Sequence, residues 1–108
     1  MAMTIRRREI WWVSLDPTVG REIKKKRPCI VLSADDINRI RSTPVVVPLS
    51  SSPETAPPII ISFPSAGPKS VAVLDQIRAV DRLRFVRKSG VIAQDELAEV
   101  LKKVLQLP

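Results

Sequence analysis

Residues 20–32 join a run of cations to an apolar segment, in the order Gly20-Arg21-Glu22-Ile23-Lys24-Lys25-Lys26-Arg27-Pro28-Cys29-Ile30-Val31-Leu32. The apolar half is rich in β-branched residues and predicts a buried strand that begins at the Arg27-Pro28 junction. Proline fixes its own φ at about −65° and pushes the preceding residue into the extended region, so Arg27 should leave the strand in a defined direction. A planar guanidinium held beside lysines suits a phosphate, although a solvated basic loop would have the same composition.

The composition describes one folded, basic domain. A chain of 108 residues predicts a single domain over residues 1–108. The net charge of +7 favours a polyanionic partner, of which nucleic acid is the commonest. No apolar run reaches the length of a membrane span, and the N-terminus lacks an apolar signal region, so we expect a cytoplasmic protein that does not bind membranes.

The strand-forming runs are short and are separated by proline, serine and glycine clusters. They predict strands over residues 9–15, 27–32, 44–50, 57–63, 70–78 and 85–87, with one helical turn over 81–84. Apolar residues at helical spacing predict a helix over residues 94–106, with acidic residues in its first turn and lysines near its end. These elements predict a mainly β fold with a C-terminal helix: a small, strongly bent antiparallel barrel of about five to seven short strands.

The first strand should be covered on both faces, because its even-numbered residues 10, 12 and 14 and its odd-numbered residues 11, 13 and 15 are all largely apolar. Trp11 and Trp12 are therefore expected in the core or at a dimer interface, with stacking on nucleic-acid bases as the alternative.

Three single residues and one loop carry local expectations. Ser33 should cap a short helical turn that ends near Asn38. Pro48 cannot donate a hydrogen bond to a neighbouring strand, so residues 44–50 should form an edge strand or contain a bulge. Cys29, the one cysteine, should be a small core residue rather than a reactive thiol. Residues 16–26 should form a long polar loop.

The residue types present restrict the chemistry. The sequence has no histidine and one cysteine, which excludes histidine- and cysteine-based zinc sites, Ser-His-Asp triads and Cys-His pairs. It has three glycines and no glycine-rich phosphate loop. A reaction that can proceed with Arg, Lys, Ser and carboxylates is RNA transesterification, since the ribose 2′-hydroxyl is itself the nucleophile.

Four blocks stand in order along the chain: EIWWVSLDPTVGRE (9–22), KRPCIVLS (26–33), VVPLSS (46–51) and DQIRAVD (75–81). Together they resemble the MazF/PemK family of toxin–antitoxin endoribonucleases, and the likeness extends to the terminal helix. The resemblance implies a homodimeric, SH3-like barrel of the CcdB/Kid type. It further implies a toxin that cleaves single-stranded RNA at a short sequence, without metal or cofactor, and leaves a 2′,3′-cyclic phosphate and a 5′-hydroxyl. A cognate antitoxin would occupy the RNA groove with its extended C-terminal segment.

The resemblance also implies roles for individual residues. The catalytic arginine of the family falls on Arg27, and the hydroxyl at the end of the third strand falls on Ser50, where threonine is usual. The family's glutamate falls on Glu22, which would orient Arg27 or accept the 2′-hydroxyl proton. An ion pair between Glu22 and Lys24 or Lys26 is the alternative.

The expected RNA-binding residues surround these three. They are Lys24, Lys25, Lys26, Ser51, Asp75, Gln76 and Arg78. Asp75 and Gln76 suit hydrogen bonding to exposed base edges, although Asp75 could instead pair with Arg78 or Arg84. The sequence departs from the family at Arg8, where glycine is common, and at Ala93, where a capping serine is usual.

Two other functions fit part of the sequence. A toxin that poisons DNA gyrase through its C-terminal helix would share the barrel but would need a distinctive helix end. Residues 105–108 are an ordinary apolar C-terminal sequence. A non-catalytic nucleic-acid-binding barrel would follow from the charge alone.

Overall fold

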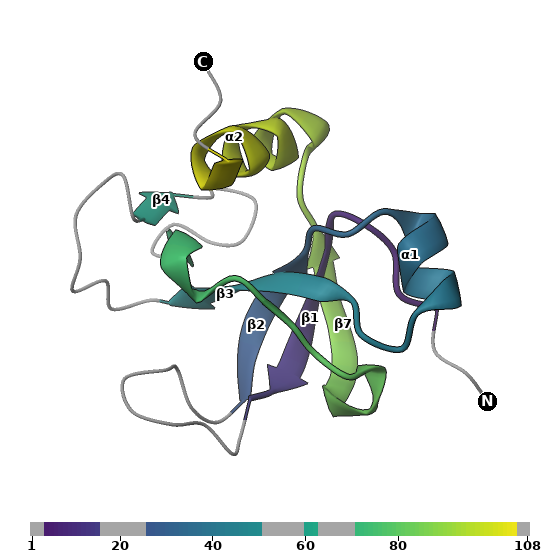
Figure 1. Ribbon diagram of the computed structural model, residues 1–108. Coiled ribbons are helices and arrows are strands. Elements are labelled where there is room, and N and C mark those ends of the chain that lie inside the picture. Colours follow the sequence, from purple (N-terminus) through teal and green to yellow (C-terminus); the bar gives the residue numbers. More distant parts are fainter. Residues whose placement is uncertain (1–3, 16–25, 51–59, 63–70, 106–108) are drawn as a thin grey trace.

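The computed structural model describes residues 4–15, 26–50, 60–62 and 71–105, and within them an antiparallel sheet carries two α-helices (Figure 1). In chain order the elements are β1 (Glu9–Ser14), β2 (Lys26–Val31), α1 (Asp35–Ile40), β3 (Val45–Ser50), β4 (Ile60–Ser62), β5 (Val71–Val73), the 3-10 turn η2 (Leu74–Gln76), β6 (Arg78–Ala79), the 3-10 turn η3 (Arg82–Arg84), β7 (Phe85–Val91) and α2 (Gln94–Leu105).

The sheet has the strand order β4-β5-β3-β2-β1-β7, and β6 pairs with β3 beside β5. Its end strands, β4 and β7, are not paired with one another within the described residues, so the sheet is open. The predicted mainly β fold with a C-terminal helix is confirmed. No helix in the described part of the chain is long and apolar enough to cross a membrane.

Both faces of the sheet carry apolar side chains, as the alternation in β1 predicted. The helix-side cluster lies under α2 and contains Ile10, Ile30, Leu32, Val47, Leu49, Ala72, Leu74, Ile92, Leu97 and Val100. The far-side cluster contains Ile5, Trp11, Val13, Leu15, Cys29, Val31, Val46, Val80 and Phe85. The core position predicted for Cys29 is therefore confirmed.

The two tryptophans of β1 have different surroundings. Trp11 is buried and meets the Phe85 ring edge-on, with a centroid separation of 5.8 Å and an interplanar angle of 71°. Trp12 is half-buried on the other face, with the Arg87 guanidinium carbon 5.6 Å from the ring centroid. Trp11 is thus a core residue, whereas Trp12 has a cation on its ring.

Residues 44–50 were expected to form an edge strand or to carry a bulge just before Ser50. The edge strand is wrong, because β3 lies inside the sheet between β2 and β5. The pairs that β2 makes with β3 show no register shift up to Pro48. The Leu32 amide donates to the Val45 carbonyl at 2.8 Å, and hydrogen-bonded pairs alternate along an antiparallel ladder. The Cys29–Pro48 pair is therefore a non-bonded one, and the Pro48 nitrogen points away from β2.

Pro48 also explains why the predicted strand over residues 70–78 is broken. On the side of β3 away from β2, β6 pairs with Val45 and Val46, while β5 pairs with Leu49 and Ser50. Between β5 and β6 the chain leaves the sheet and forms η2. This break lies opposite Pro48, which has no N–H group to donate to a neighbouring strand.

Ser33 does not cap α1, which also continues two residues beyond Asn38. The N-cap is Ala34, with no side-chain hydrogen bond. The Ser33 hydroxyl instead donates to the Asn38 side-chain oxygen and accepts from the Val45 amide at 2.9 Å, while the Asn38 amide donates back to the Ser33 carbonyl at 3.0 Å. Because Asn38 is buried, this pair fixes α1 to the start of β3.

The two departures from the family pattern have local explanations. Arg8 has φ of 78°, in the left-handed region that glycine enters without a steric cost. The Ala93 amide donates to the Glu96 carboxylate at 2.9 Å, as in one half of a capping box. The predicted helix is confirmed as α2, with Asp95 and Glu96 in the first turn and Lys102 and Lys103 in the last.

Candidate functional site

Arg27 and Ser50 lie at neighbouring ends of β2 and β3. β2 pairs Cys29 with Pro48, and Arg27 and Ser50 each lie two residues beyond that pair along their own strands. Residues two apart on a strand project from the same face, so Arg27 shares the face of Cys29 and Ser50 shares the face of Pro48. Both side chains therefore belong to the face away from α2, on which Arg27 also pairs with Val13 of the far-side cluster.

Arg27 has one buried donor without an acceptor. Its side chain is half-buried, and its Nε atom, like that of Arg7, is buried without a hydrogen-bond partner among the described residues. A buried donor without an acceptor costs about 1–3 kcal/mol. An oxyanion that accepts from Nε and a terminal nitrogen would remove this cost, because guanidinium groups bind phosphate through two parallel bonds.

Arg78 adds a second cation on the same face. It stands opposite Val46 at the start of β6 and is half-buried. Burial raises the pKa of the Cys29 thiol to about 12, and the nearby positive charge of Arg78 opposes this rise only in part. The Cys29 thiol is therefore uncharged at neutral pH. Arg78 lies close enough to Cys29, two residues from Arg27, to lower the pKa of its thiol.

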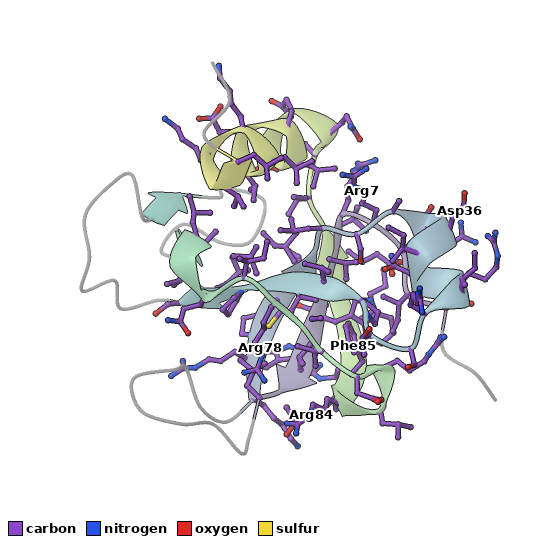
Figure 2. All side chains as sticks on the ribbon, viewed as in Figure 1. Arg7, Asp36, Arg78, Arg84 and Phe85 are labelled. Atoms are coloured by element: carbon purple, nitrogen blue, oxygen red, sulfur yellow. The ribbon has the colours of Figure 1, made fainter. Side chains whose placement is uncertain are left out.

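Further cations surround the start of β2. Lys26 is exposed and pairs with Ser14 of β1, whose carbonyl accepts a 3.2 Å hydrogen bond from Arg84. Figure 2 shows Arg78 and Arg84 on the side of the molecule away from α2. Arg84 entered the sequence reasoning only as an alternative partner for Asp75, because nothing in its local pattern indicates contact with β1.

The remaining predicted site residues lie elsewhere. Asp75 and Gln76 are in η2, between β5 and β6; Gln76 is half-buried, and the Asp75 side chain is outside the described residues. Glu22, Lys24, Lys25 and Ser51 also fall outside the described residues, as does the predicted loop up to residue 25. Within the described ranges, no three His, Cys, Asp or Glu side chains are grouped as metal ligands would be.

Glu9 is a charged residue that the sequence reasoning missed. It is 5% exposed, and its Oε1 accepts from the Arg6 amide at 2.7 Å and from the Trp11 indole at 3.0 Å, while its Oε2 lies 3.0 Å from the Lys88 ammonium. Burial acts to raise the pKa of Glu9, but the hydrogen bonds from Trp11, Arg6 and Lys88 together hold it below its ordinary value. The sequence feature that could have indicated this role is Trp11, which lies two residues along the same face of the strand and carries an indole N–H.

The chain matches known proteins along most of its length. The family model described as "PemK-like, MazF-like toxin of type II toxin-antitoxin system" matches residues 6–107. The chain is 38% identical over 79 residues to the endoribonuclease PemK of Escherichia coli, an alignment that covers 69% of this chain and 59% of PemK. It is 33% identical over 105 residues to the endoribonuclease MazF9 of Mycobacterium tuberculosis, covering 89% of each.

The fold is also that of solved toxins. MazF from Deinococcus radiodurans superposes with a TM-score of 0.83 at 26% identity, over 98% of this chain and 97% of that chain. The same protein in a MazE–MazF complex gives 0.80 at 25% identity, over 97% and 96%. On the match over residues 6–107, this chain belongs to the PemK-like, MazF-like family of type II toxin–antitoxin toxins.

Proposed function

We propose that the protein is the toxin of a type II toxin–antitoxin system and acts as an endoribonuclease that cleaves single-stranded RNA, including mRNA. The family membership and the relatives named as endoribonucleases support this activity. The observation that carries the proposal is the buried Arg27 Nε that has no acceptor among the described residues, on the same face of the sheet as Ser50 at the end of the neighbouring strand β3.

The chemistry needs no group from outside the chain and the RNA. The ribose 2′-oxygen attacks the adjacent phosphorus, the bond from phosphorus to the 5′-oxygen breaks, and the products are a 2′,3′-cyclic phosphate and a 5′-hydroxyl. The 2′-hydroxyl loses its proton to a base, and the departing 5′-oxygen gains one. Arg27 stabilises the charge that develops on the phosphoryl oxygens, and the Ser50 hydroxyl donates to the same group.

Other residues complete the proposed site. Glu22 orients Arg27 or accepts the 2′-hydroxyl proton. Lys24, Lys25, Lys26, Ser51 and Arg78 hold the RNA backbone, while Asp75 and Gln76 read base edges.

We further propose a homodimer in the cytoplasm, where its substrate is found. A cognate antitoxin would inhibit it by laying an extended C-terminal segment along the RNA groove. The MazE–MazF complex of Deinococcus radiodurans supports an antitoxin partner.

The decisive experiment incubates the purified protein with single-stranded RNA in EDTA and maps the fragment ends. We expect 2′,3′-cyclic phosphate and 5′-hydroxyl ends from the wild type. Arg27→Ala should lower the cleavage rate by about 10³-fold or more, because one well-aimed donor to a developing charge contributes about 10²–10³ and this one also carries charge. Arg41→Ala, which removes an exposed arginine just after α1, is the matched control. Full activity of Arg27→Ala would remove Arg27 from the mechanism, and salt-sensitive binding without products would indicate a non-catalytic protein.

The hydroxyl assignment has its own test. Ser50→Ala should lower the cleavage rate by about 10²-fold, since it removes a neutral donor. Ser51→Ala and Ser52→Ala should have smaller effects. Equal rates for the three variants would move the catalytic hydroxyl away from Ser50.

A further inference from the structure

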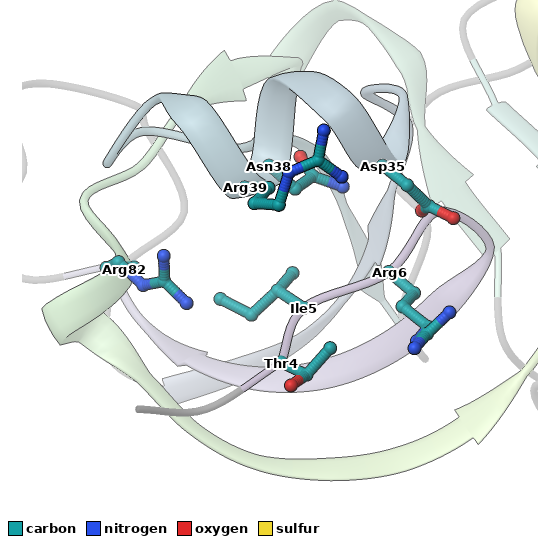
Figure 3. A pocket seen from close by; sticks show the side chains of 7 residues that line it. All are labelled: Thr4, Ile5, Arg6, Asp35, Asn38, Arg39 and Arg82. Atoms are coloured by element: carbon teal, nitrogen blue, oxygen red, sulfur yellow. The ribbon is translucent and has the colours of Figure 1, made fainter. Parts of the chain in front are cut away.

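A second cationic site lies at the opposite end of β2 and β3 from Arg27. A pocket of about 400 Å³ lies between α1 and the N-terminal segment. Figure 3 shows the side chains that line it: Thr4, Ile5, Arg6, Asp35, Asn38, Arg39 and Arg82. Since α1 connects the end of β2 to the start of β3, about five residues of strand, or about 17 Å, separate this pocket from the Arg27 position.

The pocket has a cationic rim and a partly apolar floor. Its arginines come from three separate segments: Arg6 from the N-terminal segment, Arg39 from α1 and Arg82 from η3. Ile5 and Asn38 are buried at its base. Arg39 forms an exposed 3.0 Å ion pair with Asp36, which a ligand can displace at little cost.

The backbone around the pocket is held by hydrogen bonds. Glu9 accepts from the Arg6 amide at 2.7 Å, and the Asp35 carboxylate accepts from the Arg7 amide at 2.7 Å. On the far side, the Arg82 amide donates to the Ser42 carbonyl at 2.7 Å. Three segments distant in the sequence are therefore fixed in one arrangement before any ligand arrives, which lowers the entropy cost of binding.

We propose that this pocket binds one nucleotide, with its phosphate on the arginine rim and its base against Ile5. Guanidinium forks favour phosphate, and a floor with an apolar part favours a ring over an extended peptide. Asp35 on the rim repels an acidic peptide but can accept a hydrogen bond from the exocyclic amino group of a base. The nucleotide is a unit of an RNA chain or a free nucleotide; the RNA form rests on the proposed function.

Binding of 5′-CMP and 5′-UMP, measured by calorimetry at low salt, tests the site. These nucleotides differ by an amino group against a carbonyl, so CMP should bind at least about fivefold tighter if Asp35 accepts from the base. Asp35→Asn, which leaves an oxygen for the Arg7 amide, should bring the two affinities together. Arg39→Gln and Arg82→Gln should each weaken CMP binding about tenfold, as loss of a charged hydrogen bond predicts. Arg41→Gln, an exposed arginine that does not line the pocket, should leave it unchanged.

A short RNA with 2′-O-methyl groups distinguishes the two sources, because it can bind but cannot be cleaved. If the pocket holds a unit of RNA, Arg39→Gln should reduce the slope of log affinity against log salt by about 0.7. CMP binding that depends on Arg39 and Arg82, with an unchanged RNA slope, would assign the pocket to a free nucleotide.

Three results separate this proposal from the nuclease proposal. Equal CMP binding by wild type, Arg39→Gln and Arg82→Gln would overturn the pocket assignment, even if the protein cleaves RNA. Arginine-dependent binding of oligoglutamate in place of CMP would overturn it in favour of an acidic peptide. CMP binding at the pocket in a protein that does not cleave RNA would support the pocket and reject the nuclease.

Discussion

Glu9 and Arg27 are both charged residues on the face of the sheet away from α2, yet their hydrogen-bonding states are opposite. Glu9 begins β1, and Arg27 pairs with Val13, four residues further along that strand. The Glu9 carboxylate has three partners, whereas the buried Nε of Arg27 has none among the described residues. A buried group whose hydrogen bonds are made avoids the cost of desolvation, whereas a buried donor without an acceptor reduces stability, and a phosphate bound at Arg27 would supply that acceptor.

The largest effect on stability should follow from Glu9. Glu9→Gln keeps the shape of the side chain but sets an amide N–H₂ against the Lys88 ammonium and weakens the bonds from Arg6 and Trp11. We expect a loss of about 2 kcal/mol, or a melting temperature lower by about 10 °C, since hydrogen bonds to a charged group contribute about 1.5–3 kcal/mol.

Thermal denaturation at neutral pH measures this loss, and Glu99→Gln, on the exposed face of α2, is the control. Cleavage per folded molecule should remain at the wild-type rate in both variants. An unchanged melting temperature for Glu9→Gln would show that the buried network contributes no net stability.

Acid should reproduce part of this effect without a mutation. The pKa of Glu9 in the folded protein lies below the ordinary value of 4.5, so its contribution to stability is fully present above pH 4.5. That contribution is lost as the pH falls from there through the lowered pKa. The free energy of unfolding, measured by urea denaturation between pH 6 and pH 3, should therefore fall more steeply for the wild type than for Glu9→Gln. Parallel curves would contradict the assignment of this pH dependence to Glu9.

The smallest effect should come from Arg27 and have the opposite sign. Arg27→Met keeps an apolar stem and removes the buried donor that has no partner, so the melting temperature should be unchanged or higher, by up to about 1 kcal/mol of stability. The same variant should be inactive in the RNA assay. If Arg27→Met lowered the melting temperature as much as Glu9→Gln does, Arg27 would be a structural residue. The proposed difference between Glu9 and Arg27 would then be wrong.

Periodicity in the sequence was enough for the elements that bury a regular face. Alternation in residues 9–15 predicted β1 and its two covered faces, the apolar run after Arg27 predicted β2, and the spacing from Leu97 onward predicted α2. Asp81 was expected to open one helical turn, and its carboxylate accepts from the Leu83 amide at the start of η3. Each of these signals is local, because burial of one face repeats with the period of the element itself.

Expectations that depended on the neighbours of an element were less successful. A proline in a strand favours an edge, but Pro48 lies inside the sheet because its nitrogen faces the gap between β5 and β6. Ser33 was a plausible cap by composition, yet its hydroxyl binds Asn38 and the Val45 amide, which only the packing of α1 beside β3 brings within reach.

Residue type and periodicity are properties of the chain alone, so they identify the cations and the strand at whose start Arg27 lies. Which cations lie close together depends on how distant segments pack. The fold places Arg27 and Ser50 on the same face of neighbouring strands and gathers Arg6, Arg39 and Arg82 around one pocket. It also gave Glu9 three partners and Arg27 Nε none among the described residues. Register and burial arise from contacts between segments far apart in the sequence, and no local pattern records them.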